Sequence, residues 1–338
     1  MNANHGDGGH RRLGGERRPA GARQDNERRV VRQHVGGEYL HRAVGATIRP
    51  AELIRSGVPP VSEPYRLLPQ FHERIWGLRD LSRWFPGTEF ARPVGEAWFS
   101  PHPLDDAAFP LLLKFLFTTE RLSVQVHPGD EYARKHHGSL GKTEAWHIVE
   151  AQPGAEIALG FRGPLTQQRV RDLLSEGRLE AQLNWIPVRA GETYLVPAGT
   201  VHAIGAGLTI VEVQEHSDIT YRLYDYGRPR ELHLERALEV ADLGPYRVDN
   251  TGTPLGPGRR LLTACRYFAI ERWKLPEAGP HATGSETHRL VVCLSGEGLL
   301  AGKRFAPGEV WLAPAGGRNL ELRSEDAGLL VAVPMSAS

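Results

Sequence analysis

The sequence has little cysteine, little net charge and no long apolar run. Its 338 residues include two cysteines, Cys265 and Cys293, whose separation matches no metal-binding motif. This favours buried thiols in a reducing cytoplasm over a disulfide. The 41 lysines and arginines against 40 aspartates and glutamates give a net charge of +1, so neither nucleic acid nor an anionic membrane is expected as a partner. Because no run of 18 apolar residues and no apolar segment near the first residue occur, neither a membrane span nor secretion is expected.

The first 60 residues are also poor in large apolar side chains. The segment GHRRLGGERRPAGARQDNERRVVRQHVGG is rich in Arg and Gly, and such a composition buries too little apolar surface to offset its ordering entropy. Residues 1–60 are therefore expected to form a disordered extension. An arm that binds nucleic acid is one alternative, although no aromatic residues alternate with the arginines to stack on bases. Another alternative is that the natural protein starts further downstream and does not include this segment.

From residue 61 the composition is that of a folded, mainly β protein. Short apolar runs separated by Gly and Pro turns predict β-barrels of the jelly-roll type. Residues 61–230 are expected to form a first barrel with a small helical insertion at about 164–184. A helical connection over residues 231–254 and a second barrel over residues 255–338 are expected to follow.

An internal repeat supports two barrels. AGETYLVPAGTVHAI begins at residue 190, and PGEVWLAPAGGRNLE begins at residue 307. The aligned pairs are Gly191 with Gly308, Pro197 with Pro314, and Gly199 with Gly316. Two copies of one β unit predict two similar domains. His202 of the first copy corresponds to Asn319 of the second, which indicates that the fold alone does not require this histidine.

Two other segments supply partners for His202. In LSVQVHPGD, Ser123, Gln125 and His127 alternate with valines, so they share one face of the predicted strand. A polar row inside a barrel is hard to explain by packing, because buried polar groups cost free energy unless they are bonded. In GKTEAWHIV, Lys142 and Glu144 are also two residues apart, so they too share one face of a predicted strand. The four N and O donors, without sulfur, suit a catalytic zinc ion that keeps an open position.

Four segments resemble type I mannose-6-phosphate isomerases, the zinc-dependent phosphomannose isomerases, in their short bacterial form. They are LSVQVHPGD, GKTEAWHIV, VPAGTVHAIGAG and QEHSDITYRLYDYGR. Gly191 and the pattern Pro-x-Gly-x-x-His, residues 197–202, are similar to the second cupin motif. The resemblance to the isomerase family covers roughly residues 64–335. It implies two cupin barrels, of which the second binds no metal because Asn319 replaces the histidine. It also implies one zinc ion per chain, with the ligands Gln125, His127, Glu144 and His202.

The resemblance further implies an aldose–ketose isomerase for mannose 6-phosphate and fructose 6-phosphate. This reaction transfers a proton between C2 and C1 of the sugar through an enediol. Lys142 and Arg222 would stabilise the negative charge that develops, and Ser123, Lys142 and Arg222 would bind the sugar phosphate. Either Glu212 or Lys142 would be the base, and the sequence does not choose between them.

Other interpretations remain open at this stage. Arg222 could lie on an ordinary exposed strand and pair with Asp218 or Asp225. The chain could be a non-catalytic sensor that binds a sugar phosphate, or an iron-dependent dioxygenase on the same barrel. A monomer or a weak homo-oligomer in the cytoplasm is expected.

Overall fold

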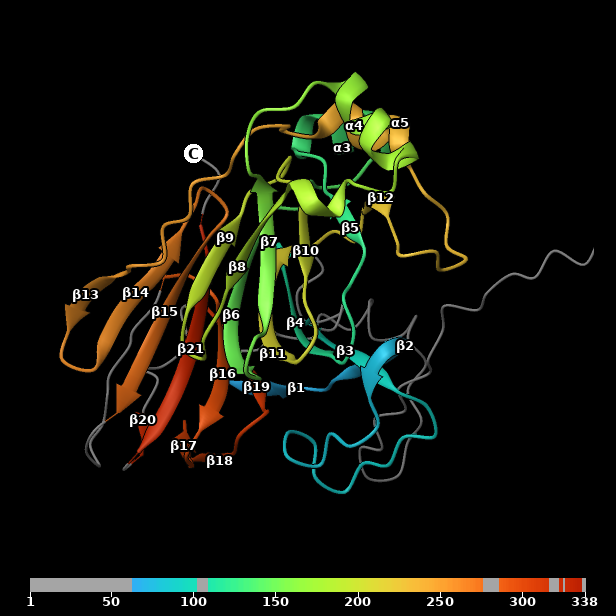
Figure 1. Ribbon diagram of the computed structural model, residues 1–338. Coiled ribbons are helices and arrows are strands. Elements are labelled where there is room, and N and C mark those ends of the chain that lie inside the picture. The colour runs from blue at the N-terminus through green and yellow to red at the C-terminus, as the bar shows by residue number, and fades with distance from the viewer. Residues whose placement is uncertain (1–62, 102–108, 276–285, 316–321, 325, 336–338) are drawn as a thin grey trace, which may run out of the picture. The chain divides into compact units, whose positions relative to one another are not determined.

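The computed structural model describes residues 63–101, 109–275, 286–315, 322–324 and 326–335 (Figure 1). All of these residues belong to one compact unit, residues 57–338. The predicted disordered extension, residues 1–60, lies outside the described residues, and so does Asn319. Within the described ranges, no helix is both long enough and apolar enough to cross a bilayer.

Two antiparallel sheets form the first barrel. The six-stranded sheet has the order β2 (Gln70–Leu78), β3 (Val94–Phe99), β4 (Leu111–Thr118), β11 (Leu208–Glu215), β6 (Glu144–Ala151) and β9 (Thr193–Val196). The five-stranded sheet has the order β12 (Tyr221–Tyr224), β5 (Val124–Val126), β10 (His202–Ile204), β7 (Glu156–Phe161) and β8 (Leu183–Pro187). Their inner faces enclose an apolar cluster that includes Leu116, Trp146, Leu159, Ile204 and Ile210. Polar residues in phase with these side chains therefore point into the barrel.

Three short helices cover the outer face of the five-stranded sheet (Figure 1). They are α3 (Asp130–His137), α4 (Gln167–Ser175) and α5 (Leu234–Val240). Val170 and Leu173 of α4 pack in one buried cluster with Val124 and Val126 of β5. Since these two valines point outward, Gln125 between them points into the barrel.

The helix of the predicted insertion is shorter than the predicted range, residues 164–184. The hydroxyl of Thr166 caps α4 by accepting a hydrogen bond from the N–H of Arg169 at 3.1 Å. The helix ends before Gly177, which adopts φ +66°, a conformation that favours glycine. A 3₁₀ turn, Glu180–Gln182, then leads into β8.

Two further antiparallel sheets form the second barrel. The seven-stranded sheet has the order β1 (Tyr65–Leu67), β19 (Val310–Ala313), β16 (Arg289–Ser295), β21 (Ala327–Pro334), β15 (Phe268–Leu275), β14 (Arg259–Ala264) and β13 (Thr253–Gly256). The three-stranded sheet has the order β18 (Lys303–Phe305), β17 (Gly298–Leu300) and β20 (Leu322–Arg323). Strand β1 pairs with β19, with Arg66 opposite Trp311. The segment that precedes the first barrel in sequence therefore contributes an edge strand to the second.

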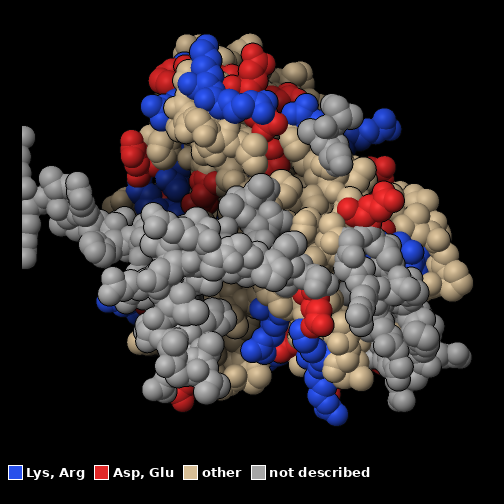
Figure 2. Space-filling model, turned by 180° about the vertical axis from the view of Figure 1, so that it is seen from behind, with Lys and Arg blue, Asp and Glu red and all other residues tan. Residues whose placement is uncertain are grey.

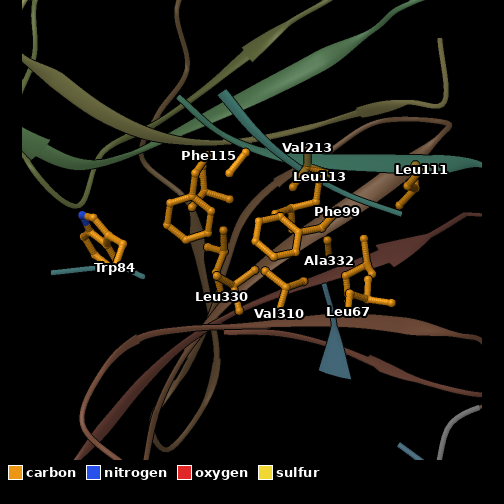
Figure 3. Packing of buried hydrophobic residues seen from close by; sticks show 14 of the residues in the cluster. Leu67, Trp84, Phe99, Leu111, Leu113, Phe115, Val213, Val310, Leu330 and Ala332 are labelled. Atoms are coloured by element: carbon orange, nitrogen blue, oxygen red, sulfur yellow. The ribbon is translucent and has the colours of Figure 1, made fainter. Parts of the chain in front are cut away.

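An apolar layer joins the two barrels (Figure 3). Phe99, Leu113 and Phe115 of the six-stranded sheet belong to one buried cluster with Val310 and Leu330 of the seven-stranded sheet. All eight residues of β4 and all eight of β11 are buried. Each large side chain that is fully buried in this way stabilises the fold by about 1.5–3 kcal/mol. The layer fixes β4 and β11 from one side, and their other side faces the interior of the first barrel.

The predicted fold class is confirmed, because the chain is mainly β and forms two cupin barrels with a small helical insertion. On the face shown in Figure 2, Lys and Arg side chains are intermingled with Asp and Glu over the described surface. This mixture agrees with a net charge of +1.

Candidate functional site

Three residues of the five-stranded sheet form a row on its inner face. His202 of β10 lies opposite Gln125 of β5, and Gln125 lies opposite Arg222 of β12. Residues that are directly opposite in adjacent strands point to the same side of the sheet. The neighbours Val124 and Val126 pack in the outer cluster, so the row faces the interior of the barrel.

Glu144 enters the same space from the facing sheet. It is the first residue of β6, and it is 1% exposed. Its Oε2 lies 3.5 Å from Nε2 of His127, and its Oε1 lies 3.4 Å from Nε2 of His202. Potential ligand atoms of these three residues all lie within 4.8 Å of one another. Two sheets thus bring together residues that are 17 and 58 positions apart in sequence (144 − 127 and 202 − 144).

The Pro-Ala-Gly turn explains why His202 lies beside His127. Gly199 has φ +89°, and its N–H donates to the carbonyl of His127 at 2.8 Å. The N–H of Thr200 donates to the carbonyl of Pro197 at 3.1 Å and closes the turn. The turn therefore attaches the start of β10 directly to the end of β5.

Hydrogen bonds fix the tautomers of both histidines. Nδ1 of His127 lies 2.8 Å from the carbonyl of Ile219, and Nδ1 of His202 lies 2.8 Å from the carbonyl of Thr200. A carbonyl only accepts, so each Nδ1 carries the proton and donates. In the neutral imidazole, Nε2 then presents a lone pair toward Glu144, which is the arrangement of a metal-ligating histidine.

Burial keeps both imidazoles neutral. It lowers the pKa of His127 well below its usual value, with a further contribution from the charge of Lys142. Burial also lowers the pKa of His202 to about 3. Both Nε2 atoms and both carboxylate oxygens of Glu144 are buried without a hydrogen-bond partner. Two lone pairs and an acid group that converge in this way fit a bound divalent cation.

A buried lysine adjoins this group. Nζ of Lys142 lies 3.2 Å from Oε2 of Glu144. Burial alone would lower the pKa of Lys142, but the charges of Glu144 and Glu212 outweigh it and raise the pKa above its usual value. Glu212 lies on β11, and its Oε2 accepts a hydrogen bond from Nε1 of Trp146 at 3.0 Å. Lys142 is therefore a fixed positive charge beside two carboxylates.

Sequence reasoning missed one residue of the site, Lys114. It lies on β4, directly opposite Glu212, and its Nζ is 3.5 Å from Oε1 of that carboxylate. The same Nζ is 3.7 Å from Asp218 and 4.2 Å from the centre of the Trp98 ring. The signal was available, because Lys114 is the one charged residue in the apolar strand LLLKFLFT. A lysine buried in such a strand needs a partner of opposite charge.

Comparison with known proteins assigns the family. No model of a protein family matches the chain. The mannose-6-phosphate isomerase of Streptococcus mutans is 34% identical over 278 residues, which cover 71% of this chain and 87% of that protein. The mannose-6-phosphate isomerase ManA of Bacillus subtilis is 34% identical over 300 residues, which cover 75% of this chain and 94% of that protein.

The chain belongs to the mannose-6-phosphate isomerase family. A solved structure agrees with this assignment. The crystal structure of mannose 6-phosphate isomerase from Bacillus subtilis matches with a TM-score of 0.71 and 28% identity. The match covers 80% of this chain and 99% of that one, so the family resemblance extends over both barrels.

In this member of the mannose-6-phosphate isomerase family, two predicted substrate-binding residues have different surroundings. Ser123 is buried, and its hydroxyl donates to Oε1 of Gln125 at 3.3 Å, so it orients the amide. Arg222 donates from a terminal nitrogen to the carbonyl of Glu231 at 2.8 Å. Its Nε is buried without a hydrogen-bond partner.

The structure does not bear out an ion pair for Arg222 with Asp218 or Asp225. Within the described ranges, no carboxylate lies within 4 Å of its guanidinium. Asp225 is engaged instead by Arg230, with two contacts of 2.5 and 2.6 Å, and Asp218 lies near Lys114. The guanidinium of Arg222 therefore has N–H donors that bond to no carboxylate of the described residues.

Proposed function

We propose that the chain is a zinc-dependent isomerase that interconverts mannose 6-phosphate and fructose 6-phosphate. Membership of the mannose-6-phosphate isomerase family supports the reaction. The observation that carries the proposal is the buried convergence of two unprotonated Nε2 atoms and a carboxylate without hydrogen-bond partners. This donor set suits zinc, and no sulfur ligand is present in it. Family membership favours catalysis over a sensor that binds without turnover.

One zinc ion per chain would be held by Nε2 of His127, Nε2 of His202 and the carboxylate of Glu144. Gln125 lies opposite His202 and offers its amide oxygen as the fourth ligand. When bound, zinc supplies a Lewis acid that polarises the oxygens of the open-chain sugar. The Nδ1–H bonds of the two histidines hold their rings in the orientation that this role requires.

Cationic side chains of this chain would stabilise the enediolate that forms when the proton leaves carbon. Lys142 is positively charged, because neighbouring carboxylates raise its pKa. Its ammonium group can contact the oxygen on which negative charge develops. Arg222 has a buried Nε without a partner, and its planar guanidinium suits the phosphate of the substrate. Ser123 would act through its hydrogen bond to Gln125.

Glu212 is the better candidate for the base that carries the proton between C2 and C1. A lysine with a raised pKa is protonated and cannot accept this proton. Glu212 is 4% exposed, and it belongs to the inner face of the barrel beside Lys142. Lys114 and Trp146 hold its two carboxylate oxygens in place. We therefore assign proton transfer to Glu212 and charge stabilisation to Lys142.

The predicted division of the chain into 61–230, 231–254 and 255–338 belongs to this proposal. Sheet membership supports it for β2 to β12, which form the first barrel, and for β13 to β21, which form the second. The exception is β1, which lies within residues 61–230 but pairs with β19 of the second barrel. We also propose that the enzyme works as a monomer or weak homo-oligomer in the cytoplasm. The two cysteines are free thiols, which suits a reducing compartment.

A coupled assay for fructose 6-phosphate tests the reaction, and metal analysis tests the cofactor. The zinc-loaded protein is expected to convert mannose 6-phosphate and to contain one zinc per chain. His202→Ala should lose zinc and lower kcat/KM by about a hundredfold or more, and a chelator should do the same to the wild type. The control is His136→Ala, on the exposed surface of α3, which should retain both its zinc and its activity. Full activity of His202→Ala, or stoichiometric iron with oxygen uptake, would contradict the proposal.

A further inference from the structure

A polar pocket lies between the edge strand β9 and the strands β13 to β15, and none of the candidate metal ligands lines it. Its volume is about 320 Å³, which is within the range of pockets that bind small organic molecules. The polar side chains that line it are those of Thr193, Asn250, Arg259, Arg260, Arg272 and Lys274. The lining also includes Gly191, Gly256 and Gly258, which add no side chain to fill the space.

The pocket carries an excess of positive charge. Four of its lining residues are cations, and none is an acid. Arg259 is neutralised by Glu271, with contacts of 2.6 and 3.1 Å. For Arg260, Arg272 and Lys274, no carboxylate of the described residues lies within 4 Å. Three of the four positive charges are therefore not matched by a carboxylate of the described residues.

These three cations share one face of two paired strands. Arg260 of β14 lies directly opposite Arg272 of β15, and Lys274 is two residues beyond Arg272 on the same strand. Like charges that are opposite in a sheet destabilise it, because their side chains are held close together. An oxyanion between them would convert this repulsion into attraction.

The surroundings of Arg272 increase the cost of an unmatched charge. Its Nε is buried without a hydrogen-bond partner, and burial lowers its pKa. Burial, and then the charge of Arg272, lower the pKa of the nearby His147 to about 3, so this imidazole stays neutral. The ring of His147 is instead hydrogen-bonded to Thr193 at 2.9 Å. A partly buried guanidinium without a partner costs free energy that a bound anion would offset.

From these observations we propose that the pocket between β9 and the β13–β15 strands binds a small organic phosphate. The ligand would place its phosphoryl oxygens between Arg260, Arg272 and Lys274. One terminal nitrogen of Arg260 bonds to the carbonyls of Thr251 and Gly252. Its other donors, the guanidinium of Arg272 and the ammonium group of Lys274 suit a phosphoryl group with several free oxygens. The pocket volume leaves room for an organic part beyond the phosphoryl group itself. This site is separate from the proposed substrate site at Arg222.

Calorimetric titration of the full-length, zinc-loaded protein tests the pocket, with inorganic phosphate and fructose 1,6-bisphosphate as probes. The variants are Lys274→Gln, the double variant Arg272→Gln/Lys274→Gln, and the control Arg304→Gln, whose side chain is 87% exposed in the second barrel. The bisphosphate is expected to bind more tightly than inorganic phosphate. Its Kd should rise about tenfold or more in the double variant, rise less in Lys274→Gln, and stay unchanged in the control.

Two further steps make the result decisive. Each titration is repeated in an Arg222→Gln background, which weakens anion binding at the proposed substrate site. Thermal unfolding shows whether the double variant folds. If it does not fold, the Kd of the single variant Lys274→Gln, which changes an exposed residue, is the deciding measurement. Equal Kd values in the wild type and the pocket variants would overturn the proposal. Inorganic phosphate that binds as tightly as the bisphosphate would overturn the assignment to an organic phosphate.

Discussion

At the scale of single residues, the candidate site depends on which atoms are left without partners. His127 and His202 each satisfy Nδ1 with a backbone carbonyl, whereas each Nε2 is buried and unbonded. A buried polar atom without a hydrogen bond costs about 1–3 kcal/mol. The unbonded atoms converge on Glu144, so the cost is concentrated where a cation would remove it.

Lys114 gives a prediction at this scale. Its ammonium group and Glu212 form a buried pair with side chains 4% and 5% exposed. Lys114→Met should lower the free energy of unfolding by about 3–5 kcal/mol, because it leaves the buried carboxylate without this partner. The double variant Lys114→Met/Glu212→Gln should recover part of the loss. Urea unfolding measures both, with Lys135→Met on the exposed surface of α3 as the control. A loss below about 1 kcal/mol would show that the pair contributes little.

At the scale of secondary-structure elements, the turn before β10 positions the site. Gly199 has a positive φ and bonds to His127, so the turn controls the separation of the two histidines. A side chain here meets two obstacles. The backbone conformation is strained for any residue other than glycine, and a Cβ atom would lie 3.2 Å from the carbonyl of Val240 in α5.

Gly199→Ala is therefore expected to destabilise the fold by about 1–2 kcal/mol through φ alone, with more from the contact to Val240. It should also weaken zinc binding, since the turn supports His127. The matched control is Gly177→Ala, because Gly177 also has a positive φ but a Cβ atom there meets nothing within 4 Å. Chemical unfolding and competitive zinc titration compare the two variants. Equal effects on stability and on zinc affinity would contradict a special role for this turn.

The same elements show how far the sequence predicts the site. Strand alternation predicted that Gln125 points to one face of its strand together with Ser123, because side chains in a strand alternate between two faces. That His202 lies opposite Gln125 is a finding of the structure. The apolar strand around Lys114 indicates that this lysine needs a partner, but one sequence does not show that Glu212 of β11 lies opposite it. The pairing of β1 with β19 was hidden for the same reason. The length of α4 was overestimated, since Gly177 breaks an otherwise helical pattern.

At the scale of the whole molecule, the two barrels share one apolar layer and are expected to unfold together. Phe115 is fully buried in this layer, against residues of the seven-stranded sheet. Phe115→Ala should lower the free energy of unfolding by about 3–5 kcal/mol and destabilise both barrels. Ile75→Ala is the control, because Ile75 is 66% exposed. Hydrogen exchange followed by mass spectrometry reports on each barrel. Faster exchange in the first barrel alone would contradict this coupling.

The alternation of side chains along β4 limits where residues can be inserted into or deleted from the chain. Lys114 points into the first barrel toward the carboxylate of Glu212, and its neighbour Phe115 points to the apolar layer. A one-residue insertion or deletion within β4 would exchange these two directions along the remaining strand. It would place an ammonium group among phenylalanines and an aromatic ring beside the carboxylates. Length variation among related chains should therefore be confined to the turns, and β4 should keep its eight residues.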